Sequence, residues 1–150
     1  MKTVNWIFRV CRYTWASPYS FVGLLLLFVA FLFGATVRIV DGTLEVAGGR
    51  LGAWMSRLPR SFQLSAITFG HVIFGRNHAL LDSLRSHEQV HVRQYERWGI
   101  LFIPVYLGSS LLQFYRGRNP YFENRFEREA YSNDTFSMVK PNPFTERNKT

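Results

Sequence analysis

The chain has a single cysteine among its 150 residues, and this scarcity excludes two kinds of stabilising site. Cys11 alone can form neither an intramolecular disulfide nor a cysteine-based zinc site. Acidic residues are also few, 10 against 18 lysines and arginines, and there are only four histidines. No internal repeat or low-complexity tract is present, so at this length we expect one domain-sized unit with one core.

The basic balance gives a formal net charge of +8, which is typical of proteins that meet nucleic acid or an anionic membrane surface. The chain contains no recognisable nucleic-acid motif, so we expect no nucleic-acid partner. It does contain an uncharged run from Tyr19 to Val37, close to the roughly 20 residues that a membrane-spanning helix requires. The sequence therefore predicts a lipid bilayer as a partner.

Residues 1–18 mix basic and aromatic side chains, as an amphipathic lead-in at a membrane interface does. We therefore predict residues 1–37 to be a lead-in and transmembrane anchor. A cleaved signal peptide is the alternative, but no small-residue cleavage site follows the run. Lysine and arginine flank the run equally, three on each side, so the positive-inside rule does not choose its orientation. The many arginines in 50–128 favour the cytoplasmic face of a bacterial-type inner membrane.

The next residues follow a β-like pattern. Asp41-Gly42 lies between alternating apolar residues, which is a hairpin signal. Residues 51–61 indicate an irregular or interfacial connection, and residues 62–75 indicate one or two strands with a bend at Gly70. Together these segments predict a small antiparallel sheet.

Residues 80–98 are predicted to form a helix that ends at Gly99, with Asp82, Ser83 or Ser86 as its cap. The apolar run 100–115 contains Pro104 and Gly108-Ser109-Ser110, which predict a bent or re-entrant helical segment, or one packed against the anchor.

A further helix is predicted over residues 121–131, and a polar, flexible tail over 132–150. The expected fold class is therefore α+β, with an N-terminal transmembrane helix followed by a small domain of sheet and helices over residues 38–131.

The predicted helix 80–98 contains His87-Glu88-Gln89-Val90-His91, an HExxH pattern. Residues four apart lie on one face of a helix, so His87 and His91 can both bind one Zn²⁺. Glu88 can then reach a water on that zinc, whose lowered pKa lets a carboxylate take its proton and later return it. The alternative is a surface helix whose two histidines are satisfied by ordinary hydrogen bonds.

A catalytic zinc needs a third protein ligand and an open position. A histidine six residues after His91 would indicate a metzincin, but Arg97 occupies that position. Downstream, Glu127-Arg128-Glu129-Ala130 forms an E-x-x-A pattern on a predicted helix, where a small residue lets two helices approach closely. Other candidates stay open: Glu123, which shares a helical face with Glu127, Glu129, which is turned away, and the histidines at 71 and 78.

HExxH followed by ExxA resembles the gluzincin metallopeptidases, and is similar to their small membrane-associated, HtpX-like forms. The resemblance covers roughly residues 62–131 and implies a zincin-like domain. It implies that the zinc ligands are His87, His91 and Glu127, and that the general base is Glu88. It also implies that the strand region 66–74 binds the peptide substrate as an added strand.

Tyr131 stands where the family usually has an aspartate that orients a ligand. We expect Tyr131, Tyr121 or His71 to donate a hydrogen bond to the oxyanion of the tetrahedral intermediate. The alternative for Glu127 is a solvated carboxylate paired with nearby arginines.

The sequence thus predicts a membrane-anchored zinc metallopeptidase acting on a peptide or protein substrate linked to the membrane. If residues 100–115 crossed the bilayer, His91 and Glu127 would lie on opposite sides and could not share one metal. A straight helix of that length rises only about 24 Å, less than the roughly 30 Å hydrocarbon core. If the zinc site is as predicted, residues 100–115 therefore do not cross the bilayer. The alternatives are a non-catalytic, membrane-anchored interaction protein with a structural or vestigial metal site, and a basic module that binds nucleic acid or lipid headgroups.

Overall fold

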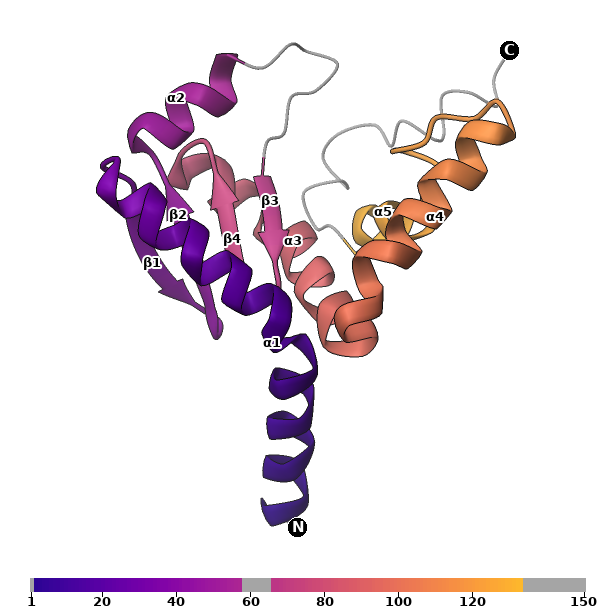
Figure 1. Cartoon of the computed structure of the whole chain (residues 1–150), viewed down its shortest axis with the longest axis horizontal. Coiled ribbons are helices and arrows are strands. Elements are labelled where there is room, and N and C mark those ends of the chain that lie inside the picture. Colours follow the sequence, from indigo (N-terminus) through magenta and orange to yellow (C-terminus); the bar gives the residue numbers. More distant parts are fainter. Residues whose placement is uncertain (1, 58–65, 134–150) are drawn as a thin grey trace.

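A small mixed sheet of four strands forms the centre of the computed structural model, which describes residues 2–57 and 66–133 (Figure 1). The α+β class predicted from the sequence is confirmed. The strands are β1 (Thr36–Val40), β2 (Thr43–Ala47), β3 (Ala66–Phe69) and β4 (Val72–Gly75). The helices are α1 (Lys2–Leu32), α2 (Gly49–Arg57), α3 (His78–Trp98), α4 (Phe102–Tyr115) and α5 (Arg125–Ser132), with the 3₁₀ turn η2 (Gly99–Leu101) between α3 and α4.

Three of the sequence predictions fall on parts of the chain that lie outside the described residues. They concern the strand start at 62–65, the tail from 134 onward, and the basic side chains of the lead-in, Lys2, Arg9 and Arg12.

The hairpin predicted at Asp41-Gly42 is confirmed, with β1 and β2 paired antiparallel on either side of it. Both turn residues have positive φ, 48° and 81°, as a tight hairpin turn requires. The prediction of a purely antiparallel sheet is wrong, because β4 pairs with β2 in parallel. The strand order is β1-β2-β4-β3, so β3 is an edge strand.

The prediction of an irregular connection over residues 51–61 is also wrong, because α2 occupies most of it. A parallel pair needs a long crossover connection, and α2 belongs to the one that joins β2 to the second hairpin. Gly52 and Met55 are buried on the same side of α2, three residues apart. A Cβ at Gly52 would lie 2.3 Å from the Arg76 carbonyl oxygen, so glycine allows α2 to approach the end of β4.

The N-terminal apolar segment is one helix, α1, which continues through Pro18 and ends at Leu32, before the predicted end of the anchor at Val37. Its N-terminal part projects away from the other elements, whereas its C-terminal part lies across the sheet (Figure 1). Ala30 and Leu27 pack into a core cluster with the sheet residues Val46, Val72 and Phe74. The opposite face stays exposed and apolar, with Phe21, Leu25, Phe28, Phe31 and Leu32.

Gly23 sets how closely α1 approaches the sheet, and its replacement by valine should lower stability by about 1–3 kcal/mol. A Cβ there would lie 2.8 Å from the Val72 Cβ and 2.9 Å from the Phe69 carbonyl oxygen. Thermal unfolding of the detergent-solubilised chain measures the effect. Gly108→Val is the matched control, because nothing lies within 4 Å of the Cβ position in this other helix. Equal unfolding temperatures for the two variants would contradict the packing argument.

Helix α3 begins two residues earlier than predicted, at His78, and its cap is not one of the three residues that the sequence suggested. The Asn77 side chain accepts a hydrogen bond from the Leu80 N–H at 2.8 Å, which satisfies an otherwise free backbone donor. The predicted caps Asp82, Ser83 and Ser86 lie inside the helix. The predicted end at Gly99 is confirmed, with φ of 52° and a backbone N–H bonded to the Tyr95 carbonyl.

The second apolar run bends at η2 and is then a single helix, α4, so the breaks predicted within it are wrong. Pro104 lies in the first turn of α4, where its missing N–H would have had no helical partner. The Gly108-Ser109-Ser110 segment continues the helix. By length and apolar composition alone, two helical stretches, Tyr13–Leu32 and His78–Tyr115, could span a membrane, and little of the most apolar window of each is buried.

The chain returns along α4 after the helix ends. Asn124 Nδ2 donates to the Tyr106 carbonyl at 3.0 Å and to Ser110 Oγ at 2.7 Å. Helix α5 begins at Arg125 instead of the predicted residue 121, because Asn124 caps it by accepting from the Phe126 N–H at 2.9 Å. These contacts place α5 beside α3 and α4 (Figure 1).

Candidate metal centre

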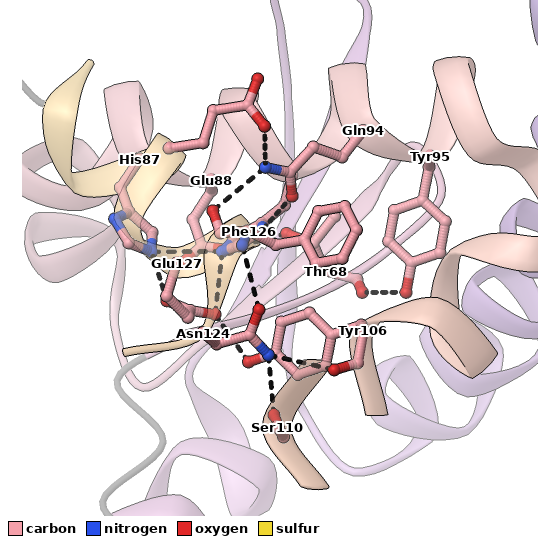
Figure 2. Close-up of polar contacts among 12 residues, drawn as sticks. Thr68, His87, Glu88, Gln94, Tyr95, Tyr106, Ser110, Asn124, Phe126 and Glu127 are labelled. Carbon is pink, nitrogen blue, oxygen red and sulfur yellow. Dashed lines mark hydrogen bonds and ion pairs between the residues drawn. The ribbon is translucent and has the colours of Figure 1, made fainter. Parts of the chain in front are cut away.

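Two histidines of α3 and one glutamate of α5 meet in the interior (Figure 2). His87, His91 and Glu127 expose only 5%, 8% and 3% of their surface. The two imidazole Nε2 atoms lie 3.2 Å apart. Glu127 Oε2 lies 3.3 Å from His87 Nε2, and Glu127 Oε1 lies 3.4 Å from His91 Nε2. The structure therefore brings together the three residues that the two motifs suggested as ligands.

Packing of α5 on α3 follows from the residues on either side of Glu127. Phe126 is buried in an aromatic cluster with Tyr95 of α3 and Phe102 of α4. Ala130 is fully buried, so a small side chain lies where the predicted close approach of the two helices requires one. Glu127 lies between these two contacts and is directed at the histidines (Figure 2).

The contacts among the three ligand residues, with one Glu127 oxygen facing each histidine, are close to the ligand spacing around a tetrahedral metal. Zinc bonds of about 2.0–2.2 Å place neighbouring ligand atoms of a tetrahedron about 3.3–3.6 Å apart. Among the described residues, Glu127 Oε2 has no hydrogen-bond donor beyond its 3.3 Å contact with His87 Nε2, and His87 Nδ1 has no hydrogen-bond partner. A buried carboxylate oxygen without a hydrogen bond is costly, and a bound cation would remove that cost. The group could therefore hold a metal ion.

Gln94 determines which nitrogen of His91 is free. Its amide nitrogen donates to the Phe126 carbonyl at 3.1 Å and to Glu129 Oε2 at 3.0 Å. Its oxygen must therefore face His91 Nδ1, 2.9 Å away, and accept a hydrogen bond from it. In the neutral form of His91 with the proton on Nδ1, the lone pair of Nε2 is directed at the other two ligand residues, as a metal ligand requires.

Glu127 is held as a carboxylate by its neighbours. Burial by itself would raise its pKa, but contacts with His87, His91 and the Tyr106 hydroxyl outweigh burial and place the pKa well below its usual range. Tyr106 of α4 donates to Glu127 Oε1 at 2.7 Å. The third candidate ligand is therefore ionised and oriented before any metal binds.

A pocket of about 320 Å³ lies beside the three ligand residues, between the edge strand β3 and helix α4. Residues Ala66–Phe69 of β3 form one wall, and Ile103, Tyr106 and Leu107 of α4 form another. Glu88 lines the pocket, where its Oε2 accepts a hydrogen bond from Thr68 Oγ1 at 2.7 Å. The structure thus places Glu88 at the same pocket as the ligand group, oriented by β3.

The candidate oxyanion donors differ in position. Tyr121 lines the pocket, and its hydroxyl hydrogen-bonds to Tyr131. The Tyr131 ring packs edge-on against His87, with centroids 4.7 Å apart, and is not among the residues that line the pocket. His71 lies elsewhere, with its Nδ1 atom 2.9 Å from Ser20 Oγ of α1.

The rival ligands are not part of the group. Glu129 accepts from Gln94 and lies 3.8 Å from Arg97, on the far side of Gln94. His78 Nε2 lies 2.7 Å from Thr36 Oγ1 of β1. Glu123 precedes α5 and does not join the three ligand residues.

Sequence reasoning missed four residues around the centre: Thr68, Gln94, Tyr106 and Asn124. Two had a signal that could have been used. Gln94 lies three residues after His91 and therefore on the same helical face. Asn124 lies three residues before Glu127, the spacing of a helix cap. Thr68 and Tyr106 had no such signal, because only packing brings β3 and α4 to this pocket.

Comparisons of this chain with protein-family models, with curated proteins and with solved structures find no match.

Proposed function

We propose that the protein is a membrane-anchored, zinc-dependent peptidase. One observation carries this proposal: three buried metal-ligating side chains meet at a pocket whose wall is β3, an edge strand of the sheet in the described part of the chain. Zinc held by His87, His91 and Glu127 would polarise the scissile carbonyl and lower the pKa of a water molecule at the open position. The same zinc chemistry underlies the resemblance to gluzincin peptidases.

Glu88 is the proposed general base and acid. Its carboxylate lines the pocket and is held by the Thr68 hydroxyl, so it is oriented before substrate arrives. It would take a proton from the attacking water and return it to the leaving amine, while that water's oxygen bonds to the carbonyl carbon and the C–N bond breaks. Tyr121, at the same pocket, is the candidate hydrogen-bond donor to the oxyanion.

The pocket walls indicate how a substrate would bind. An extended peptide can pair with the outer edge of β3, which no other strand of the described residues occupies; β3 also carries Thr68. Ile67, Phe102 and Ile103 make the pocket mostly apolar, which favours an apolar side chain near the scissile bond. Leu107 lines the pocket and is also exposed on the apolar surface of α4. A substrate linked to the membrane would fit this arrangement.

The test is hydrolysis of a peptide library by the zinc-loaded, full-length chain in detergent, with Glu88→Gln as the comparison. Cleavage that is confined to the unsubstituted chain and blocked by a zinc chelator supports the proposal. No cleavage of any peptide would favour a metal site without catalysis.

Gln94 should be a positioning residue for the metal. Replacing it with leucine removes the acceptor that keeps the proton on His91 Nδ1, so zinc affinity should fall roughly 10–100-fold. Competition with a chelating dye measures this affinity, and circular dichroism checks that the fold is retained. Gln89→Leu is the matched control, because Gln89 is on the same helix but contacts Thr43. Equal zinc affinity in the two variants would contradict the role of Gln94.

A further inference from the structure

A second pocket, of about 720 Å³, lies between α1, α2 and the sheet. Its volume is within the range of small-molecule and cofactor sites, which are mostly apolar with a few placed polar groups. Its walls include Leu26 and Val29 of α1, Met55 of α2 and Phe74 of β4. Helix α2 lies near the C-terminal end of α1 in the fold, so the groove is formed where these two helices meet the sheet (Figure 1).

The groove is continuous with the exposed apolar surface of α1. Leu26 and Val29 line it, yet 42% and 48% of their surface is exposed. These residues belong to the same outer face as Leu25 and Phe28. A hydrocarbon chain could therefore pass from a bilayer that contacts α1 into the groove without crossing a polar surface.

One face of α2 carries a cationic rim for this groove. Arg50, Trp54 and Arg57 are spaced four and three residues apart, so their side chains share a face. All three line the groove and are exposed. Within the described part of the chain, neither guanidinium forms an ion pair with a carboxylate. Tryptophan between two arginines is a combination suited to the headgroup level of a membrane.

We propose that this groove binds an anionic phospholipid of the bilayer. The acyl chain would lie between α1, α2 and the sheet, and the phosphate would be bound by Arg50 and Arg57. This site does not depend on zinc or on hydrolysis. Ile67 and Phe69 line both this groove and the pocket of the metal centre, so a bound lipid would contact β3 on either side of Thr68.

The test is lipid retention by the full-length chain, incubated in detergent with equimolar phosphatidylglycerol and phosphatidylcholine and then examined by native mass spectrometry. We expect about one phosphatidylglycerol per chain, retained roughly 30-fold over phosphatidylcholine, since two arginines near a lipid headgroup supply that preference. Arg50→Gln with Arg57→Gln should abolish the preference. Arg116→Gln with Arg118→Gln, which removes the same charge at exposed positions outside the groove, should keep it.

A second variant tests whether the lipid binds in the groove or only to the positive charge of the surface. Ala53→Trp places a large ring in the groove wall and keeps both arginines, so lipid retention should be lost. Retention in Ala53→Trp equal to that of the unsubstituted chain would overturn the proposal. Equal retention of the two lipids by the unsubstituted chain would overturn it as well. So would equal loss of preference in the two arginine pairs, or no retained lipid.

Discussion

The full-length chain, purified in detergent, should contain about one zinc per chain, and the His91→Ala and Glu127→Ala variants should contain none. The Nε2 atoms of His87 and His91 lie 3.2 Å apart, and each lies within 3.4 Å of a Glu127 carboxylate oxygen, so the three side chains already face one another. Removing any one of them leaves two ligands, too few for a catalytic zinc site. Elemental analysis of the dialysed protein measures the effect, and loss in both variants would also establish that residues 91 and 127 lie on one side of the membrane.

The controls for zinc content are His78→Ala and Glu123→Ala. Both residues were ligand candidates from the sequence, and both lie outside the group in the structure. They should keep the zinc of the unsubstituted chain. If the His91→Ala variant loses its zinc and the Glu127→Ala variant keeps it, the third ligand is a residue other than Glu127. No zinc in the unsubstituted chain after reconstitution would contradict the metal centre and the proposed function with it.

Substituting Glu88 by glutamine should lower peptide hydrolysis by about 10²–10⁴-fold and leave zinc content unchanged. Glutamine keeps the shape of the side chain and can still accept a hydrogen bond from Thr68 through its amide oxygen, so the pocket should remain intact. It cannot accept the proton of the attacking water. Initial rates with a cleaved library peptide, measured beside zinc content in the same preparation, separate loss of catalysis from loss of metal.

Glu123→Gln is the matched control for this variant, because it removes one carboxylate charge close to α5 and outside the pocket. Its rate should stay within about twofold of the unsubstituted chain, since surface substitutions away from a site have small effects. Activity retained in a zinc-containing Glu88→Gln preparation would rule out the proposed mechanism. Equal losses in Glu88→Gln and Glu123→Gln would also contradict it.

Helix α1 is part of the scaffold of the centre as well as a candidate membrane segment. Ala16 is fully buried in the aromatic cluster that holds Phe126, the residue beside Glu127. The Tyr19 hydroxyl donates to the Ile100 carbonyl at 2.9 Å, at the bend between α3 and α4. Helix α1 therefore contacts the elements that hold the metal centre, while much of its own apolar surface stays exposed.

Features that depend on neighbouring residues could be predicted from the sequence alone. The HExxH spacing places two histidines one turn apart on any helix, and Asp41-Gly42 allows the positive φ values of a tight hairpin. Gly99 ends α3 for the same kind of local reason, because glycine adopts its φ of 52° without strain. The ExxA pattern indicated which carboxylate to examine, although not what would orient it.

Features that depend on distant residues were decided only by the tertiary structure. The parallel pairing of β2 with β4 follows from the crossover through α2, which local pattern did not reveal. Thr68, Gln94 and Tyr106 contact residues of the metal centre because β3, α3, α4 and α5 pack together there. Each of the three donates a hydrogen bond to a residue of another element. Hydrophobicity alone identified α1 as an apolar helix, but only packing shows that one face of it covers the sheet. The physical reason is that spacing along the chain determines local geometry, whereas side-chain shape and burial determine which surfaces meet.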